Sequence, residues 1–402
     1  MTFQKHIRLL SFLSLLLISA CRIVSDFPKS EGFSMAADEG VYFRQGQVVK
    51  SEGLAGYKHL LKDYLGDENL QLYPGPLRVL HIGFVSVALC FHNGITSLAT
   101  ISLCWFICLC LICWHFIRKL WGERLAFTTC SLLCFAPLLS GMARRALMDS
   151  EVAFFSLLAL FLLLAYCKTP SRSNAIGLLL ALTACLLLKE TLQVIYPFFP
   201  ACLFFAYWQG RLLRVLPIFV ITVVPVLIAG LAYIFLFGGL QGPAMAYQLM
   251  GVVNLQHPMP YVRDFGSGPW YQYFIDFFLL SPVVSIGFFL GTGLFLGEKG
   301  EKDFSTICLL GYMTWLILTH VFIPKNIRYA ISLEPIYVLM TSLFLLKLTS
   351  RIGPVRIRNL ILGLCVAGIV LLELGTYQHF FIEANMYDPV SANLLKAMKM
   401  IP

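Results

Sequence analysis

Charged residues are scarce in this chain of 402 residues. Asp, Glu, Lys and Arg together make up 13% of it, hydrophobic residues make up 58%, and the mean hydropathy is +0.79. A soluble protein of this length has too small an interior to remove so much apolar surface from water. The composition therefore excludes an ordinary soluble domain and predicts that most of the chain lies in a lipid bilayer.

The sequence also lacks the marks of several protein classes. It has no internal repeat, no low-complexity segment and no basic loop long enough for a nucleotide-binding domain, which argues against an ATP-driven pump. Its 13 cysteines lie mostly in apolar runs, as Cys104 and Cys108 do, without the spacing of a zinc or disulfide framework. We interpret them as small apolar side chains of membrane helices.

Apolar runs recur along the chain, each close to the ~20 residues that a helix needs to cross the hydrocarbon core. They lie near residues 7–24, 95–117, 124–141, 151–167, 174–188, 192–208, 215–238, 282–297, 306–322, 333–348 and 358–377. We therefore expect an all-α polytopic membrane protein of about 11 transmembrane helices, forming a single membrane-embedded domain over residues 1–402. The first run follows Lys5 and Arg8 and ends in Ala20-Cys21, an order that imitates a lipoprotein cleavage site. We interpret this run as the first span, because the other runs already anchor the chain.

The basic residues indicate the orientation of these spans. The 30 Lys and Arg residues outnumber the 21 Asp and Glu residues, giving a net charge of +9. They gather in short loops that fall on one side of the membrane, at 118–124, 168–172, 211–214 and 347–358. Because Lys and Arg favour cytoplasmic loops, this side and the N-terminus are predicted to be cytoplasmic. Topology thus accounts for the charge, and no nucleic-acid partner is expected.

The opposite side receives a first extracytoplasmic loop at 25–94, a turn at 142–150 and a late extracytoplasmic loop at 239–281. Residues 77–91 are apolar enough for a short span, but counting them as one would invert every later loop. We expect a helix in the outer interface there. The protein is predicted to lie in the bacterial inner membrane, with its unusual chemistry facing the periplasm or exterior.

Charged residues in these outer segments are the candidates for chemistry. Asp38 and Glu39 follow the first span, and Arg144, Arg145 and Asp149 stand at the mouth of two helices. Arginines on an outer face break the charge bias and cost insertion energy, which favours a functional role. The competing interpretations are a solvated loop acid for Asp38 and a salt bridge at a helix end for the arginines.

Two further cations are expected on the same face. Lys189 lies between two apolar runs, and Arg328-Tyr329 enters a later one. Such side chains suit the binding of a phosphate at the membrane surface. The alternative is that they only extend toward the interface, as long cationic side chains often do.

Taken in order, several short patterns resemble one membrane enzyme superfamily. They are Asp38-Glu39 with Tyr42, Leu120-Trp121-Gly122, Arg145 with Asp149, Lys189, Pro269-Trp270-Tyr271 and Arg328-Tyr329. This order resembles the protein mannosyltransferase and lipid A aminoarabinose transferase superfamily, whose members have the GT-C fold, and it covers nearly the whole chain. The chain departs from the pattern at residues 74–78, where members commonly have two prolines and an aromatic cluster, so the acceptor stays open.

The resemblance implies a glycosyltransferase that moves a sugar from a polyprenyl-phosphate donor to an acceptor lipid, protein or glycan. It implies Asp38 as the general base, Glu39 as a residue that orients the acceptor, and Asp149 as a residue that binds the acceptor or positions a loop. The residues expected to bind substrate are Tyr42, Arg144, Arg145, Lys189, Arg328 and Tyr329. Among these, Lys189 and Arg328 would bind the phosphate, and Arg144 or Arg145 would pair with Asp38 or with phosphate.

No cofactor is required by the sequence, although Asp38, Glu39 and Asp149 would also allow a divalent metal. The expected partners are the lipid-linked donor, membrane lipids and the acceptor. Three other classes remain open: a secondary transporter, another lipid-linked glycan enzyme such as a ligase or polymerase, and a membrane scaffold. A transporter would place ionisable residues near the middle of its spans and often show two related halves.

Overall fold

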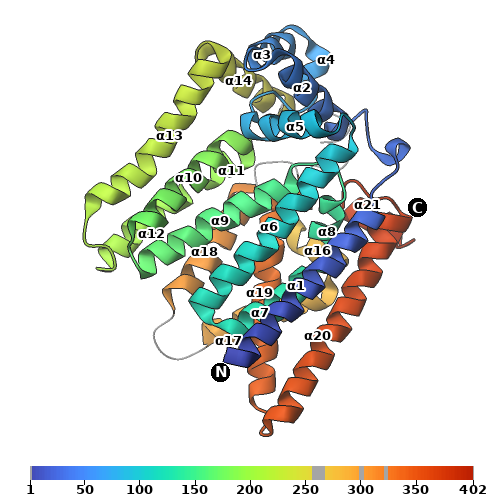
Figure 1. Ribbon diagram of the computed structural model, residues 1–402, viewed down its shortest axis with the longest axis vertical. Helices are drawn as coiled ribbons and strands as arrows, with labels where there is room; N and C mark the ends of the chain where they lie inside the picture. The colour runs from blue at the N-terminus through green and yellow to red at the C-terminus, as the bar shows by residue number, and fades with distance from the viewer. Residues whose placement is uncertain (1, 256–267, 298–302, 321–324, 402) are drawn as a thin grey trace.

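The computed structural model describes residues 2–255, 268–297, 303–320 and 325–401, and within these ranges it contains helices and no strands (Figure 1). Helices satisfy their backbone hydrogen bonds internally, which a segment inside a bilayer requires. The predicted all-α membrane fold is thereby confirmed.

Seven segments are long and apolar enough to cross a membrane. They are His6–Ser25 of α1 (Thr2–Ser25), α6 (Thr96–Trp121), α9 (Asp149–Lys168), Glu190–Trp208, α13 (Val215–Phe237), Ile327–Ser350 and Val355–Glu383. The helices α7 (Glu123–Leu133) and α8 (Pro137–Ala143), which are bent by 58° at their junction, would together make an eighth.

The predicted count of about 11 spans is not confirmed. Three of the predicted spans are short helices, α10 (Arg172–Leu188), α17 (Pro282–Gly297) and α18 (Phe304–His320). Their 16 or 17 residues reach roughly 24–26 Å at about 1.5 Å per residue, less than the ~30 Å hydrocarbon core. The apolar composition predicted that these segments are helices, but composition does not specify where each helix begins and ends. Residues 321 and 322 of the predicted span 306–322 lie outside the described residues.

The break between α7 and α8 has a local cause. Pro137 opens α8 and holds the preceding Ala136 in an extended conformation. The N–H groups of Leu138 and Leu139 then donate to the two carboxylate oxygens of Glu334, at 3.2 and 2.7 Å. The buried helix end is therefore satisfied by a side chain from a distant part of the chain.

A group of short helices from the first predicted loop covers one end of the long helices. We call it the cap: α2 (Asp38–Glu52), α3 (Ala55–Gly66), α4 (Glu68–Gln71) and α5 (Val79–Phe91), shown in blue at the top of Figure 1. A Cβ at Gly46 of α2 would lie 2.3 Å from Val85 of α5, so glycine permits the close approach of these two helices. With 13 residues, α5 is too short to span the membrane, and it lies across the end of the long helices (Figure 1). The placement of 77–91 in the outer interface stays a prediction.

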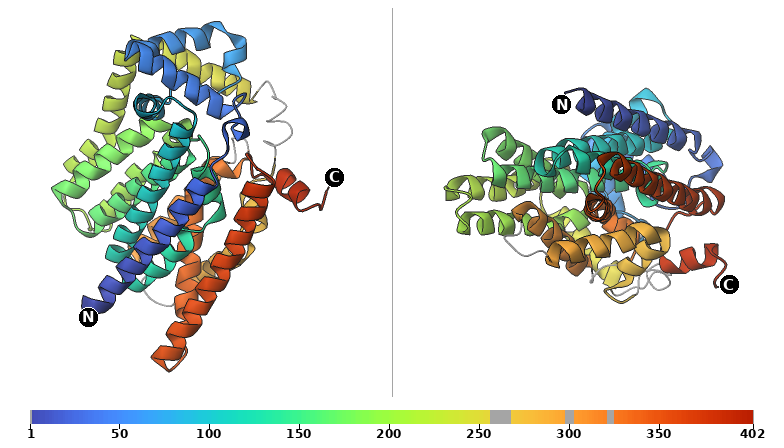
Figure 2. Two further views of the ribbon diagram at one scale, coloured as in Figure 1. Left: turned by 45° about the vertical axis from the view of Figure 1, so that its right-hand side comes forward. Right: turned by 90° about the horizontal axis from the view of Figure 1, so that it is seen from below.

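The long helices differ in how much of their surface is covered. The central α9 has 83% of its apolar window buried, whereas the peripheral α1 has 22% and Val355–Glu383 has 17%. The last of these segments comprises α20 (Val355–Tyr377) and η3 (Gln378–Glu383), and it runs along the same side of the molecule as α1 (Figure 2). The apolar residues of α1 and α20 that stay exposed are suited to contact lipid.

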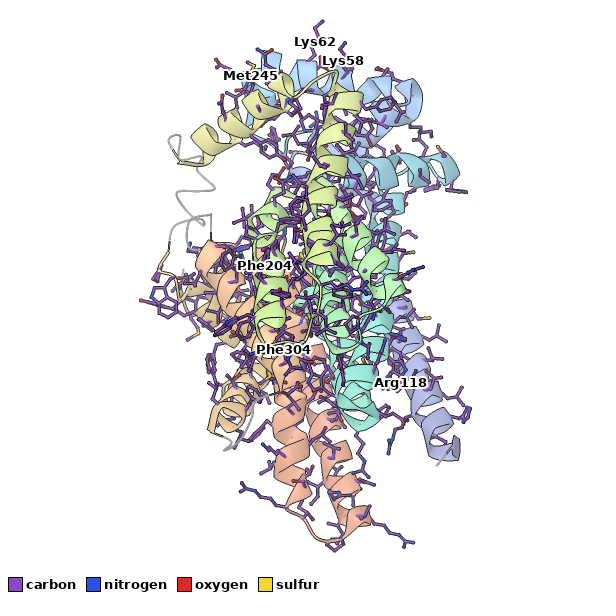
Figure 3. All side chains as sticks on the ribbon, turned by 90° about the vertical axis from the view of Figure 1, so that its left-hand side faces the viewer. Lys58, Lys62, Arg118, Phe204, Met245 and Phe304 are labelled. Carbon is purple, nitrogen blue, oxygen red and sulfur yellow. The ribbon has the colours of Figure 1, made fainter. Side chains whose placement is uncertain are left out.

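Basic residues lie at both ends of the molecule. Figure 3 shows Lys58 and Lys62 on the cap and Arg118 toward the opposite end, with the half-exposed Phe204 between these levels. Beyond η3, the chain returns through residues 384–390 to the short helix α21 (Ser391–Ala397). The single-domain assignment over 1–402 stays a prediction.

Candidate active site

Arg328 forms ion pairs with carboxylates from three distant parts of the chain. It lies in η2 (Ile327–Leu333), whose first turn is capped by the side chain of Asn326 accepting from the Arg328 N–H at 3.0 Å. Its Nε donates to Asp149 at 3.0 Å, its Nη1 to Asp388 at 2.9 Å and its Nη2 to Asp38 at 3.5 Å. The rigid fork of the guanidinium group therefore fixes these acids around a single buried cation.

Lys189 is a second buried cation beside Arg328. It occupies the extended break between α10 and α11 (Glu190–Ile195), with its Nζ 3.5 Å from Asp149 and 4.9 Å from the ring centre of Tyr329. Burial lowers the pKa of Lys189, Asp149 opposes this effect, and the positive charges of Arg78 and Arg328 add to it. The environment thus favours an additional anion near Lys189.

Asp38 is the most accessible carboxylate of this cluster. Its side chain is 32% exposed, compared with 16% for Asp388 and 0% for Asp149. Asp38 and Asp149 are the first residues of α2 and α9, where the helix dipoles stabilise a negative charge. Asp38 is therefore a carboxylate within reach of a ligand, whereas Asp149 is enclosed between Arg328 and Lys189.

Glu39 points away from this cluster and binds Arg145. Its two oxygens accept from Arg145 Nε at 3.0 Å and Nη2 at 2.7 Å, and also from the N–H groups of Ala146 at 2.9 Å and Ser34 at 2.6 Å. Both side chains of the pair are buried. The structure therefore brings Arg145 to Glu39 rather than to Asp38, and this pair fastens α2 to the turn before α9.

Gly40 permits the chain before α2 to fold back over Glu39. A Cβ at residue 40 would lie 1.9 Å from the carbonyl oxygen of Met35, so a side chain there would push away the segment that folds back over Glu39. That segment supplies the Ser34 N–H to Glu39. The close approach thus places Asp38 at the helix end and Glu39 in the interior.

Arg144 donates hydrogen bonds to the backbone of two other segments. Its Nε donates to the carbonyl oxygen of Asp26 at 2.8 Å, and its Nη1 donates to that of Phe381. It therefore joins the end of α1 to η3, while Arg145 also donates to Asn385 at 3.2 Å. The structure does not bring either arginine into contact with Asp38.

Tyr42 lies in a neighbouring polar group with Arg78 and Glu190. Arg78 forms an ion pair with Glu190 at 3.1 Å and donates to the Tyr42 hydroxyl, which in turn donates to the sulfur of Met148 at 3.4 Å. Burial raises the pKa of Tyr42 well above its ordinary value, although the charge of Arg78 opposes this effect. The phenol stays protonated and supports Arg78 beside the Asp38 cluster.

Behind Tyr42 lies a buried pair that sequence reasoning did not assign. His81 Nδ1 lies 3.0 Å from the carboxylate of Glu151. The rings of Tyr42 and His81 pack edge to face, with their centres 4.5 Å apart. His81 and Glu151 are both almost fully buried. The pair thus links α5 to α9 beneath the polar group.

Sequence reasoning also missed Arg78, Glu190 and Asp388 as members of the site. Arg78 and Glu190 flank segments that were singled out, and their charge in outer segments was the available signal. Asp388 carries no such signal, since it lies in the C-terminal tail and its contact with Arg328 spans 60 residues of sequence.

The predicted carboxylates do not form a metal site. Asp38, Glu39 and Asp149 each face an Arg or Lys side chain, and Glu39 uses both oxygens on Arg145. No group of three or more His, Cys, Asp or Glu side chains suited to a metal ion occurs in the part of the chain that the structure describes. Carboxylates that already face Arg and Lys side chains do not fit a divalent cation.

Comparison with known proteins identifies the fold. No family profile and no curated protein matches the sequence. Among solved structures, ArnT from Cupriavidus metallidurans bound to undecaprenyl phosphate is similar over 98% of this chain and 75% of its own, with 13% identity and a TM-score of 0.54. The chain has a GT-C fold.

A second GT-C structure agrees with this assignment. The archaeal oligosaccharyltransferase AglB from Archaeoglobus fulgidus, in complex with an inhibitory peptide and a dolichol-phosphate, is similar over 91% of this chain, with 14% identity and a TM-score of 0.59. The chain spans 55% of the length of AglB. At these identities the likeness establishes the GT-C fold alone, and it confirms the fold implied by the sequence resemblance.

Proposed function

We propose that the chain is a membrane glycosyltransferase that moves a hexosyl or pentosyl group from a polyprenyl-phosphate donor to a lipid, protein or glycan acceptor. One observation carries the proposal: the partly exposed Asp38 lies 3.5 Å from Arg328, which shares Asp149 with the buried Lys189. A base and two cations are thus adjacent. This combination suits the removal of a proton from an acceptor and the stabilisation of a departing phosphate.

The reaction assigns a separate task to each of these groups. The acceptor hydroxyl gives its proton to the carboxylate of Asp38 while its oxygen forms a bond to the anomeric carbon of the sugar. The bond between that carbon and the lipid phosphate breaks, and the phosphate oxygen keeps the electron pair. Lys189 and Arg328 stabilise the negative charge that develops on the phosphate, and Asp38 later releases its proton to solvent.

The contacts of Arg328 suggest how donor binding prepares the base. Its contact with Asp38 is the longest of its three ion pairs, at 3.5 Å compared with 3.0 Å to Asp149 and 2.9 Å to Asp388. A phosphate that approaches the same nitrogen would compete first with Asp38. Donor binding then frees Asp38 to accept the proton of the acceptor.

The structures with this fold support the choice of donor. ArnT was solved with undecaprenyl phosphate and AglB with a dolichol-phosphate, both of which are polyprenyl phosphates. For this chain, the long helices with exposed apolar residues provide a surface for such a tail, and the cations at Lys189 and Arg328 provide one for its phosphate.

The sidedness follows from the distribution of charge. Arg118 lies toward the end of the molecule opposite the cap (Figure 3). Lys168 is the last residue of α9, whose first residue, Asp149, belongs to the Asp38 cluster. These two basic positions therefore lie away from the Asp38 cluster. By the preference of Lys and Arg for the cytoplasm, we assign the site to the extracytoplasmic face of a bacterial inner membrane.

The decisive experiment offers labelled polyprenyl-phosphate sugars, with lipid, peptide and glycan acceptors, to membranes enriched in the protein. We expect label to pass to one acceptor class and the transfer to disappear in an Asp38→Asn variant. Membranes that neither transfer a sugar from any donor nor bind a polyprenyl phosphate would overturn the proposal. Transfer to a growing glycan would place the protein with the ligases or polymerases of the same donor chemistry.

A further inference from the structure

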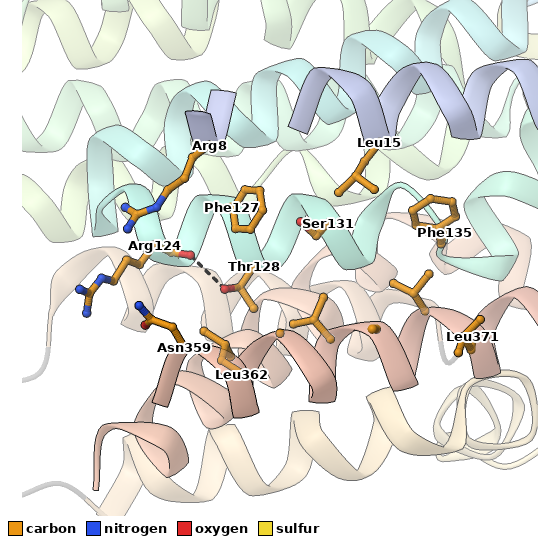
Figure 4. Close-up of a pocket in the computed structure, with 14 residues that line it drawn as sticks. Arg8, Leu15, Arg124, Phe127, Thr128, Ser131, Phe135, Asn359, Leu362 and Leu371 are labelled. Carbon is orange, nitrogen blue, oxygen red and sulfur yellow. Dashed lines mark hydrogen bonds between the residues drawn. The ribbon is translucent and has the colours of Figure 1, made fainter. Parts of the chain in front are cut away.

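An apolar groove lies between α1, α7 and α20 (Figure 4). Figure 1 shows these helices extending away from the cap. Its volume is about 620 Å³, within the usual range for a small-molecule site. The side chains that define it are Leu15 of α1, Phe127 of α7, Phe135 in the break between α7 and α8, and Leu362 and Leu371 of α20. The groove is separate from the Asp38 cluster, and nothing in the proposed reaction uses it.

The charge of the groove is confined to one end. Arg8, Arg124 and Asn359 lie together there, and the lining toward Phe135 and Leu371 is apolar (Figure 4). Glu123 approaches Arg8 only at 3.8 Å, and Arg124 forms no ion pair with any acid in the described ranges. With two arginines and one glutamate, this end keeps a net positive charge and suits an anionic group.

The length of the groove matches one leaflet of a bilayer. From Asn359 to Leu371, α20 advances 12 residues, which is about 18 Å at 1.5 Å per residue. Half of a hydrocarbon core of ~30 Å is about 15 Å. A molecule with its charged group at Arg8 and Arg124 would therefore end near the middle of the membrane.

Two features inside the groove point to a ligand. Gly363 lines it, and a Cβ at this position would meet no atom within 4 Å, so the glycine leaves open space beside α20. Ser131 also lines it and is 2% exposed, yet its hydroxyl has no hydrogen-bond partner among the described residues. In contrast, the Thr128 hydroxyl donates to the Arg124 carbonyl oxygen at 3.0 Å. A buried hydroxyl without a partner is costly, and an ester carbonyl of a lipid would satisfy it.

We propose that this groove binds one anionic glycerophospholipid from the leaflet opposite the Asp38 cluster. The lipid phosphate lies between Arg8 and Arg124, an ester oxygen accepts from Ser131, and an acyl chain fills the space beside Gly363. Basic pockets between membrane helices are suited to anionic headgroups, which are concentrated in cytoplasmic leaflets. The bound lipid holds the peripheral helices α1 and α20 against α7 and takes no part in sugar transfer.

The test measures lipid retention by the purified full-length protein. Native mass spectrometry is carried out after incubation with micelles that contain phosphatidylglycerol or, separately, phosphatidylcholine. We expect one phosphatidylglycerol to be retained in preference to phosphatidylcholine. The pair of changes Arg8→Gln and Arg124→Gln should weaken this retention roughly tenfold or more, because each arginine near the surface attracts an anionic lipid.

Two further variants separate charge from shape. Changing Arg118→Gln and Lys119→Gln removes the same charge from the same end of the bundle, at exposed positions that do not line the groove, and should leave retention unchanged. Gly363→Leu keeps every charge but fills the open space, so it should reduce retention without a clash that would prevent folding.

Several results would overturn the proposal. Equal retention of the two lipids, full retention by the Gly363→Leu protein, or equal loss in both pairs of charge variants would each show that the groove does not recognise an anionic phospholipid. Displacement of phosphatidylglycerol by a polyprenyl phosphate would assign the groove to the donor tail. Dimers in which this groove is buried and lipid-free would assign it to a second copy.

Discussion

At the residue scale, the site consists of ion pairs that share partners. Arg328 binds Asp38, Asp149 and Asp388, and Asp149 is also bound by Lys189. Breaking a buried ion pair by removing one partner leaves the other uncompensated, so most single changes here affect folding as well as binding. Asp38 is the exception, because it is partly exposed and its one ion pair among the described residues is the longest contact of Arg328.

The first prediction concerns Asp38. Asp38→Asn preserves the shape of the side chain but cannot accept the proton of the acceptor, so we expect transfer to fall by ~10² to 10⁴-fold. Donor binding and thermal stability should stay close to those of the unchanged protein. The measurement is the rate of sugar transfer under saturating donor, and a near-normal rate would remove Asp38 as the base.

Glu39 provides the matched control for this change. Glu39→Gln keeps the shape but removes the charge that faces Arg145 in the interior, at a cost of about 3–5 kcal/mol of folding free energy. We therefore expect a lower melting temperature for this variant. The protein that stays folded should lose less transfer activity than the Asp38→Asn variant does. Loss of transfer equal to that of Asp38→Asn, without loss of stability, would show that the two acids act together.

The second prediction concerns the phosphate. Removing one charge-assisted contact costs roughly 1.5–3 kcal/mol, so Lys189→Ala and Arg328→Ala should each weaken donor binding by about 10- to 150-fold. Arg328→Lys keeps the positive charge without the fork that reaches three acids, and should recover only part of the affinity. Binding of a labelled polyprenyl phosphate is the measurement. Unchanged affinity in both alanine variants would return the two cations to a purely structural role.

At the scale of elements, the C-terminal segment is held in place by a buried acid. Asp276 of α16 (Gln272–Leu280) accepts from the Ser391 hydroxyl at the start of α21 and from Gln272 at 3.3 Å. Residues between η3 and α21 include Asp388, which binds Arg328. The packing of α16 against α21 therefore positions one of the three acids around Arg328.

The third prediction uses the protonation of this acid. Burial raises the pKa of Asp276 from 3.8 to about 6, although its hydrogen bonds with Ser391 and Gln272 oppose this effect. Because the folded pKa is above the unfolded one, the stabilisation is fully present below about pH 4 and is lost as the pH rises to about 6. The melting temperature should fall over this window, and Asp276→Asn should remove that part of the pH dependence. The same fall in the Asn variant would assign it to another group.

At the scale of the whole molecule, the polar site and the basic loops lie at opposite ends of an apolar bundle. The cap covers the end near Asp38, and Arg118 lies toward the other end. The exposed apolar residues of α1, α13 and α20 form the surface between them. This separation gives the molecule two faces that can be tested independently of its activity.

The fourth prediction concerns topology. Lys62 and Arg118 are both exposed, so Lys62→Cys and Arg118→Cys should react readily with a maleimide. In intact cells, a membrane-impermeant maleimide should label Lys62→Cys only, and Arg118→Cys should react after the membrane is opened. The unchanged protein, with its own 13 cysteines, gives the background. The reverse order of labelling would place the Asp38 cluster in the cytoplasm and contradict the assigned face. Asp149→Cys is unsuitable because that position is fully buried.

The sequence by itself determined the properties that depend on composition and on neighbours along the chain. Its scarcity of charge required a membrane, its apolar runs marked the helices, and its charged outer segments marked Asp38, Asp149, Lys189 and Arg328. It could not give helix length. The ends of α10, α17 and α18 depend on the packing around them, which composition does not specify.

Only the tertiary structure decided which of these charges meet. The ion pairs of Arg328 with Asp149 and Asp38 span 179 and 290 residues, and no local pattern encodes contacts over such separations. The structure also turned Glu39 inward to Arg145 while leaving its neighbour Asp38 partly exposed, brought Asp388 to the site and opened the groove beside Gly363. These outcomes depend on how helices pack in three dimensions, because burial and charge pairing are set by the neighbours in space.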